Sequence, residues 1–208
     1  MIELYTWGTP NGQKIPIMLE ECGLPYTVHP VDIGKGQQNT PAFRAINPNG
    51  KIPAIVDRQP DGDITVFESG AILIHLAEQS GKLLPSVPAQ RMACLSWLFW
   101  QIGGFGPMVG QWGFFNRQKD APNRAALQRY FDESVRLLGV LDARLGAVPY
   151  LAGEYSIADL ACYTWARAGL HGIGEKHPEV RTQFANLNRW IAAIDARPAV
   201  QAGMNVLR

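Results

Sequence analysis

The sequence lacks the cysteine and histidine patterns of redox and metal proteins. Its three cysteines (Cys22, Cys94 and Cys162) form an odd, widely spaced set without a C-x-x-C pair. Neither a disulfide framework nor an internal dithiol redox pair is therefore expected, and a reducing compartment is indicated. The four histidines show no ligand spacing to one another or to the cysteines, so no metal site is predicted.

Strong charge and long apolar runs are absent as well. A net charge of +1 over 208 residues provides no basic face for nucleic acid, which is not expected as a partner. No run of about 18 apolar residues is present, so no membrane span or membrane partner is predicted. The N-terminus has neither the basic nor the apolar region of a signal peptide, and it resembles the start of a folded strand. These absences predict a cytoplasmic protein.

The segment 1–80 alternates strand and helix patterns. Strands are predicted over 2–5, 27–31, 54–56 and 64–67, and helices over 14–22, 41–46 and 69–80, with a polar loop over 34–40. The first strand, helix and strand form a βαβ unit, for which parallel pairing is expected. A Pro-Asp-Gly turn at 60–62 predicts a hairpin between the last two strands. The order βαβ-ββα is typical of a small mixed sheet with helices on its faces.

Strand patterns stop after Leu84-Pro85-Ser86. The remaining segments read as helices, over 89–102, 124–145, 157–170 and 184–196. No Gly/Ser-rich linker separates the two halves. We therefore expect two packed domains, an α/β domain over 1–85 and an all-helical domain over 86–208.

The segment 97–116 is rich in aromatic residues and glycine. Gly103-Gly104 should weaken or kink a helix there, and Pro107 should break the hydrogen-bond ladder again. The pattern is consistent with a core helix followed by an ordered loop. It is equally consistent with an aromatic wall that the glycines open for a bulky ligand.

Thr9-Pro10-Asn11-Gly12 connects the first predicted strand to the first helix. Pro10 suits an early helical position, where its missing N–H costs little. A helix N-terminus favours a thiolate or a carboxylate, and Thr9 and Asn11 can both donate hydrogen bonds. Taken alone, the motif also fits a plain helix cap.

Two more short motifs lie at strand ends. A cis bond at Ile52-Pro53 would leave the Ile52 backbone unpaired and able to bind an extended peptide, whereas a trans proline would start an edge strand. Glu68-Ser69 stands between a strand and a helix. Ser69 fits an N-cap whose free N–H groups can hold a carboxylate, and Glu68 can pair with an ammonium group.

Together, in this order and β-β-α context, the motifs resemble the glutathione transferase superfamily over essentially the whole chain. Ser156 and Asp159 resemble the superfamily's capping box, with Tyr155 packing on Leu160 as a hydrophobic staple. The segments 9–12, 31–36, 49–57, 67–73 and 97–104 closely resemble the bacterial Nu-class group. The resemblance implies a thioredoxin-like, glutathione-binding domain over 1–85. It also implies disulfide-bond reduction by glutathione thiols rather than by an enzyme cysteine.

The resemblance further implies how glutathione is held. The Ile52 backbone, with Pro53 cis, would pair with the cysteinyl part of the ligand. Glu68 would hold the γ-glutamyl ammonium group, and Ser69 would hold the γ-glutamyl carboxylate.

The same resemblance implies the catalytic residues, Thr9 and Asn11, which would stabilise the sulfur and lower the pKa of the thiol. Lys51 and Gln38 would reach the glycyl end. Arg129 is either a solvated arginine or, as the resemblance implies, reaches across a dimer interface to the partner's glutathione.

The predicted function is glutathione-dependent disulfide reduction or glutathione transfer, with reduced or oxidised glutathione as co-substrate and a small-molecule disulfide or electrophile as second substrate. A homodimer is expected from the family. The alternatives are a non-enzymatic binding or docking protein and a glutathione-dependent isomerase. Tyr5 competes with Thr9 as the sulfur donor, although its apolar strand favours core packing. Cys22 lies late in a helix and reads as a small buried hydrophobe.

Overall fold

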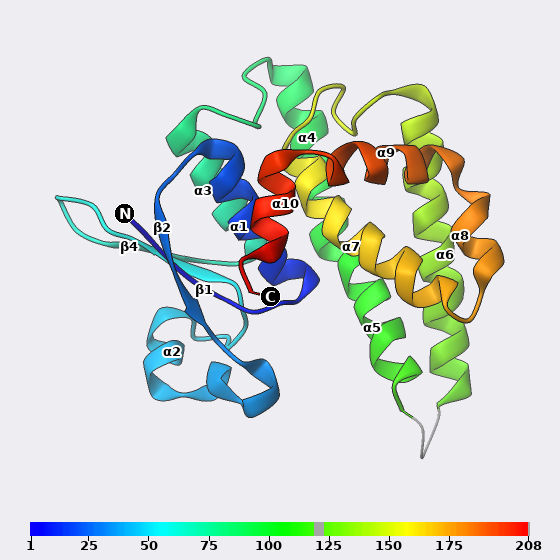
Figure 1. The fold of residues 1–208 in the computed structure, drawn as a ribbon, viewed down its shortest axis with the longest axis horizontal. Helices are drawn as coiled ribbons and strands as arrows, with labels where there is room; N and C mark the ends of the chain where they lie inside the picture. The colour runs from blue at the N-terminus through cyan, green and yellow to red at the C-terminus, as the bar shows by residue number, and fades with distance from the viewer. Residues whose placement is uncertain (119–122, 208) are drawn as a thin grey trace. The chain divides into compact units, whose positions relative to one another are not determined.

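A four-stranded sheet organises the first part of the computed structural model, which describes residues 1–118 and 123–207 (Figure 1). Its strands are β1 (Ile2–Thr6), β2 (Tyr26–Pro30), β3 (Ala54–Asp57) and β4 (Ile64–Phe67), in the order β2-β1-β3-β4. β1 pairs in parallel with β2 and antiparallel with β3, and β3 forms a hairpin with β4. The mixed sheet confirms the predicted thioredoxin-like βαβ-ββα fold.

Helices cover both faces of this sheet (Figure 1). α1 (Pro10–Cys22) and α3 (Ser69–Ser80) lie on one face, and α2 (Pro41–Ile46) lies on the other. Side chains alternate along β1, as the strand geometry requires. Thr6 is buried towards α1, where its hydroxyl donates to the Gly12 carbonyl at 2.9 Å. Tyr5 points to the opposite face, where its ring lies against Phe43 of α2.

The stretch predicted as a polar loop over 34–40 is more ordered than its composition indicated. It contains two 3₁₀ turns, Ile33–Lys35 and Gln37–Asn39. The side chain of Asp32 caps the first turn by accepting the backbone N–H of Gly34 at 2.9 Å. The polar composition therefore belongs to capped turns rather than to an irregular loop.

The chain divides into two compact units, one from Met1 to Leu84 joined by the segment from Ala196 onwards, and one from Pro85 to Asp195. The returning segment contains α10 (Pro198–Asn205), which packs on α1. A Cβ on Gly203 would lie 2.5 Å from the backbone nitrogen of Ile17, so the two helices meet backbone to backbone. The assignment of functional domains to 1–85 and 86–208 stays a prediction.

The second unit is helical. Its elements are α4 (Pro88–Trp100), a π-helical turn (Gln101–Phe105), α5 (Gly106–Asn116), α6 (Arg124–Ala147), α7 (Ile157–Gly174), α8 (Pro178–Gln183) and α9 (Ala185–Asp195). α7 is the most buried of them and contacts α4, α8 and α9. Among the helices described here, none is both long enough and apolar enough to cross a membrane.

The interpretation of the segment 97–116 as a core helix followed by an ordered loop was wrong. The chain stays helical from α4 through the π-helical turn into α5, and Pro107 lies in the first turn of α5. The hydrogen-bond register changes at this junction, so a residue without an N–H is tolerated there. Gly106 lies close to the buried Gln101, because a Cβ there would be 2.4 Å from the side-chain amide nitrogen, which would have to shift.

A buried carboxylate holds the start of α7. Asp159 accepts hydrogen bonds from the backbone N–H of Leu151 at 2.9 Å, from the backbone N–H of Ser156 at 3.1 Å and from the Trp190 indole at 3.0 Å. The capping box of Ser156 and Asp159 is present as predicted. Burial nevertheless dominates over these donors and raises the pKa of Asp159 to about 6.

Asp159 should make stability depend on pH. Its pKa is about 6 in the folded state against 3.8 for a free aspartate, so the native state binds the proton more tightly and the free energy of unfolding falls as pH rises from about 4 to 6. A difference of about two pKa units corresponds to roughly 3 kcal/mol. Asp159→Asn should remove this fall in urea unfolding curves recorded at several pH values.

The exposed Asp61→Asn serves as the matched control and should keep the pH dependence of the wild type. Superimposable pH profiles for the wild type and Asp159→Asn would contradict the assignment.

Candidate functional site

The register of the sheet brings four chain segments to one edge. β1 and β2 end together, with Thr6 opposite Pro30. β3 starts at the same edge, with Ala54 opposite Tyr5, and the last residue of β4, Phe67, lies opposite Ala54. Because paired strands lie about 4.8 Å apart, the adjoining segments emerge side by side. They carry Thr9 and Asn11 after β1, Gln38 after β2, Lys51, Ile52 and Pro53 before β3, and Glu68 and Ser69 after β4.

Thr9 is the N-cap of α1. Its hydroxyl oxygen accepts the backbone N–H of Gly12 at 3.2 Å. A hydroxyl can accept and donate at once, so capping leaves the Thr9 hydrogen available to a ligand. The two interpretations of the motif, helix cap and sulfur donor, are therefore compatible. Asn11 lies in the first turn of the same helix.

Gly12 has a role that the sequence did not reveal. A Cβ at this position would lie 1.9 Å from the Trp7 carbonyl oxygen and 2.7 Å from the Thr6 hydroxyl. Only glycine lets α1 begin this close to the end of β1. The position of Thr9 therefore depends on the absence of a side chain three residues further along.

The Ile52-Pro53 peptide bond is cis, as one of the two alternatives required. Within the residues that the structure describes, no hydrogen bond uses the N–H or carbonyl of Ile52. The side chain of Ile52 packs against a small core cluster of Val31, Phe43 and Ala54. The backbone of Ile52 is thus held in place and can pair with an extended peptide.

Asn47 shapes the loop that leads to Ile52, and the sequence did not single it out. Its side-chain amide donates to the Lys51 carbonyl at 2.6 Å and accepts the backbone N–H of Asn49 at 2.9 Å. The Lys51 side chain, which follows this loop, is exposed. Asn47 is 1% exposed, which places both bonds in a protected environment.

The loops that carry Gln38 and Lys51, the two residues predicted for the glycyl end of the ligand, lie close together at Gly50. Gly50 has a φ of 63°, and a Cβ there would lie 3.1 Å from the Gln38 carbonyl oxygen. The loop after β2 therefore lies against the loop before β3. The side-chain oxygen of Gln38 is buried and accepts no hydrogen bond from any described residue.

The prediction that Ser69 is the N-cap of α3 was wrong. Glu68 is the N-cap, with a φ of 72°, and Ser69 is the first helical residue. The chain turns sharply out of β4, and this left-handed residue supplies the turn. No side chain caps α3, so its first N–H groups are open to an anion.

Lys14 is a second residue that the sequence did not single out. It lies on α1 with no exposed surface, and its ammonium group donates to the Ser69 hydroxyl at 3.2 Å. The bond joins the two helices whose first turns carry Thr9 and Ser69. A lysine in a helix is ordinarily solvated, so the sequence around Lys14 gave no indication of its burial.

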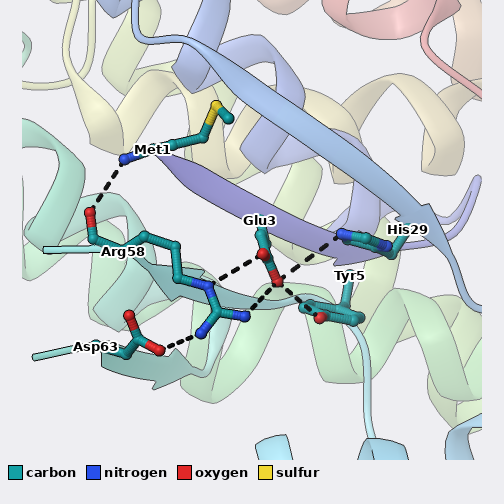
Figure 2. Close-up of polar contacts among 6 residues, drawn as sticks. All are labelled: Met1, Glu3, Tyr5, His29, Arg58 and Asp63. Atoms are coloured by element: carbon teal, nitrogen blue, oxygen red, sulfur yellow. Dashed lines mark hydrogen bonds and ion pairs between the residues drawn. The ribbon is translucent and has the colours of Figure 1, made fainter.

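Tyr5 does not belong to this site. Its side chain lies on the face of the sheet opposite α1, where its hydroxyl donates to Glu3 at 3.0 Å and its ring stacks on His29 (Figure 2). Glu3 also accepts from Arg58, at 3.0 Å and 2.9 Å. Burial raises the pKa of the Tyr5 phenol. Core packing, the alternative that its strand favoured, describes its contacts.

The three cysteines are free and buried, as predicted for Cys22. Burial raises the pKa of both the Cys22 and the Cys94 thiol, and Cys22 also accepts a hydrogen bond from the Ser80 hydroxyl at 3.2 Å. A buried thiol with a raised pKa is a poor nucleophile. Over residues 1–118 and 123–207, no group of three or more His, Cys, Asp or Glu side chains is placed to hold a metal ion.

Two predictions concern the second unit. Arg129 is exposed on α6 and lines a cavity of about 690 Å³ with Met108 and Asp132. Its reach towards a partner's glutathione stays a prediction. In the aromatic segment, Phe105 belongs to the core, whereas Phe99 is 60% exposed. A role of the exposed rings in binding a second substrate also stays a prediction.

A thioredoxin-like sheet with a proline-led strand and two helix N-termini at one edge matches a known class of protein. A family model described as the N-terminal domain of glutathione S-transferase matches residues 9–79, which contain all of these motifs. The disulfide-bond oxidoreductase YfcG of Escherichia coli is 51% identical over 172 residues, covering 81% of this chain and 80% of that protein. The disulfide-bond oxidoreductase YghU of Escherichia coli is 38% identical, covering 100% and 75%. The chain belongs to the glutathione transferase family.

Solved structures agree with this assignment. A glutathione transferase from Pseudomonas putida, with one glutathione disulfide bound per subunit, superposes with a TM-score of 0.93 at 44% identity, covering 99% of this chain and 91% of that one. A family member from Pseudomonas fluorescens pf-5, with two glutathione molecules bound, gives a TM-score of 0.91 at 45% identity, covering 98% and 92%.

Gly12→Ala should disrupt the start of α1. The new Cβ would overlap the Trp7 carbonyl, which must move, and overpacking of this kind costs about 1–3 kcal/mol. Thermal unfolding and glutathione titration should show lower stability together with weaker binding. Gly8→Ala is the matched control, because a Cβ there meets nothing within 4 Å. Equal behaviour of the two variants would show that the close approach does not matter.

Proposed function

We propose that this protein reduces disulfide bonds with glutathione and also transfers glutathione to electrophiles. The observation that carries the proposal is the gathering of hydroxyl donors, an unpaired peptide backbone and an uncapped helix N-terminus at one edge of the sheet. The three cysteines, by contrast, are all buried. The names of the two Escherichia coli relatives and the glutathione disulfide bound to the Pseudomonas putida structure support the same reaction.

The three parts of the ligand match three parts of the edge. The Ile52 backbone pairs with the cysteinyl residue, in the manner of strand addition. The open N–H groups of α3 and the Ser69 hydroxyl hold the γ-glutamyl carboxylate, and Glu68 pairs with its ammonium group. Lys51 supplies a point charge for the glycyl carboxylate, while Gln38 lies beside it.

The backbone of Glu68 supports this assignment independently. A φ of 72° is unfavourable for any residue with a side chain, and such strain costs about 1–3 kcal/mol. Glycine would adopt the same conformation without that cost. The presence of glutamate here indicates that its carboxylate has a function, and pairing with the ligand's ammonium group provides one.

Thr9 and Asn11 act on the sulfur. A free thiol with a pKa near 8.5 is mostly protonated at neutral pH, so hydrogen bonds and the α1 N-terminus raise the share of thiolate. The thiolate attacks one sulfur of the substrate disulfide, the S–S bond breaks, and the leaving thiolate takes up a proton. A second glutathione thiolate then attacks the mixed disulfide, which releases glutathione disulfide and the second substrate thiol.

We also propose that the protein acts as a homodimer in the cytoplasm. The exposed cavity around Arg129 supports an interface on α6, and the free cysteines are typical of a reducing compartment. In this arrangement Arg129 contributes to the partner's glutathione site.

Substitutions at Thr9 should separate capping from catalysis. Thr9→Asp keeps an N-cap acceptor but cannot donate to a thiolate and repels it, so stability should persist while turnover falls about 10- to 100-fold. Thr9→Ser keeps both roles and should retain most activity. Turnover is measured with a small disulfide and glutathione, and stability by thermal unfolding.

Thr9→Ala loses the cap as well and should be less stable than Thr9→Asp by about 1 kcal/mol. Full turnover by Thr9→Asp would remove Thr9 from the chemistry.

Cysteine replacement tests the source of the redox thiols. Cys22→Ala should lose some stability, because the buried Sγ packs in the core, but it should keep the disulfide-reductase turnover of the wild type. The same outcome is expected for Cys94→Ala. If turnover disappears in a Cys22→Ala protein that still folds and binds glutathione, the cysteine-free mechanism is wrong.

A further inference from the structure

We infer that Lys14 is a positioning residue of the glutathione site, which orients Ser69 and supplies positive charge for the γ-glutamyl carboxylate. The inference rests on the proposed function, because it assigns a further residue to the same site. Lys14 lies on α1, whereas the carboxylate-binding segment begins α3. Its contact with Ser69 spans 55 positions of the chain.

The hydrogen bond between Lys14 and Ser69 has a defined direction. An ammonium group can only donate, so the Ser69 oxygen, 3.2 Å away, must accept. A hydroxyl that accepts from a cation directs its own hydrogen elsewhere. At the first position of α3, the acceptor that matches this hydrogen together with the open backbone N–H groups is a carboxylate.

The electrostatics point the same way. The Lys14 side chain has no exposed surface, so little water screens its charge. It lies next to the N-terminus of α3, where the helix macrodipole is already positive. A nearby cation and the positive end of a helix each lower the free energy of an anion bound beside them. The Lys14 charge and the α3 dipole therefore both favour a ligand carboxylate over a neutral group.

Lys14 also links the two ends of the proposed ligand site. It lies five positions after Thr9, which caps α1, and it donates a hydrogen bond to the first residue of α3. The side chain thus adds a hydrogen bond to the packing of α1 against α3, which sets the distance between the sulfur donor and the carboxylate-binding segment. A leucine or methionine would fill the same space but would provide neither charge nor a donor.

The test compares two ligands in two proteins. The ligands are glutathione and its analogue in which the γ-glutamyl α-carboxylate is a carboxamide. The proteins are the wild type and Lys14→Met, which keeps an unbranched chain of similar length. Loss of a hydrogen bond that involves charged groups should weaken glutathione binding about 10- to 100-fold in calorimetric titrations. Binding of the carboxamide should change by less than about twofold.

Lys82→Met is the matched control. Lys82 belongs to the same unit and donates to the Cys22 carbonyl at 3.0 Å, but it is exposed. The Lys82→Met protein should bind both ligands as the wild type does. Lys14→Arg, which retains the charge, should recover part of the preference for the carboxylate.

The outcomes are distinguishable. Equal losses for both ligands in Lys14→Met would mean that Lys14 only supports the fold, and no loss for either would overturn the inference outright. If the wild type itself binds no glutathione, the proposed function fails and the inference fails with it. If the wild type binds but shows no dependence on Lys14, the inference alone fails.

A measurement on the wild type covers the case in which Lys14→Met does not fold. Lys14 is buried, whereas Lys35, Lys51, Lys82 and Lys176 are exposed. The protons of the Lys14 ammonium group should therefore exchange slowly with water, and this group should give a distinct signal in ¹⁵N NMR. Glutathione should shift this signal, and the carboxamide should not. An unchanged Lys14 signal on saturation with glutathione would overturn the inference.

Discussion

The antiparallel pairing of β3 with β1 is the constraint on which the site depends. It places Ala54 opposite Tyr5, and therefore starts β3 where β1 ends. Every chain segment proposed to contact glutathione in the first unit leaves the sheet at that edge. All four residues of β3 are buried, and the strand pairs along its whole length with both β1 and β4. A slip of one residue would move each of its side chains to the opposite face of the sheet.

The second constraint is the close contact between elements around α1. Gly12 lets α1 begin against the Trp7 carbonyl, and Gly203 lets α10 approach the backbone of α1. Lys14 joins α1 to α3 from inside the unit. These contacts leave two helix N-termini facing the same edge of the sheet, where their dipoles favour anionic groups.

Local patterns predicted the elements that local physics controls. The bounds of β4 and α3 follow from a turn, an alternating run and a glycine stop, and the α7 capping box follows from Ser156 and Asp159. Patterns were less reliable where neighbours decide. Pro107 is accommodated because the π-helical turn changes the hydrogen-bond register, and Ser69 is not a cap because Glu68 supplies the left-handed turn out of β4.

By itself, the sequence determined the order of strands and helices, the family resemblance and the identity of the polar residues at strand ends, because periodicity, turn chemistry and short motifs are local. Only the tertiary structure decided which alternatives hold. Tyr5 lies on the far face because strand side chains alternate, and the Ile52 backbone is left unpaired because β3 begins beyond it. Lys14 is buried against Ser69 because two helices 55 positions apart pack together, and no local pattern records such a contact.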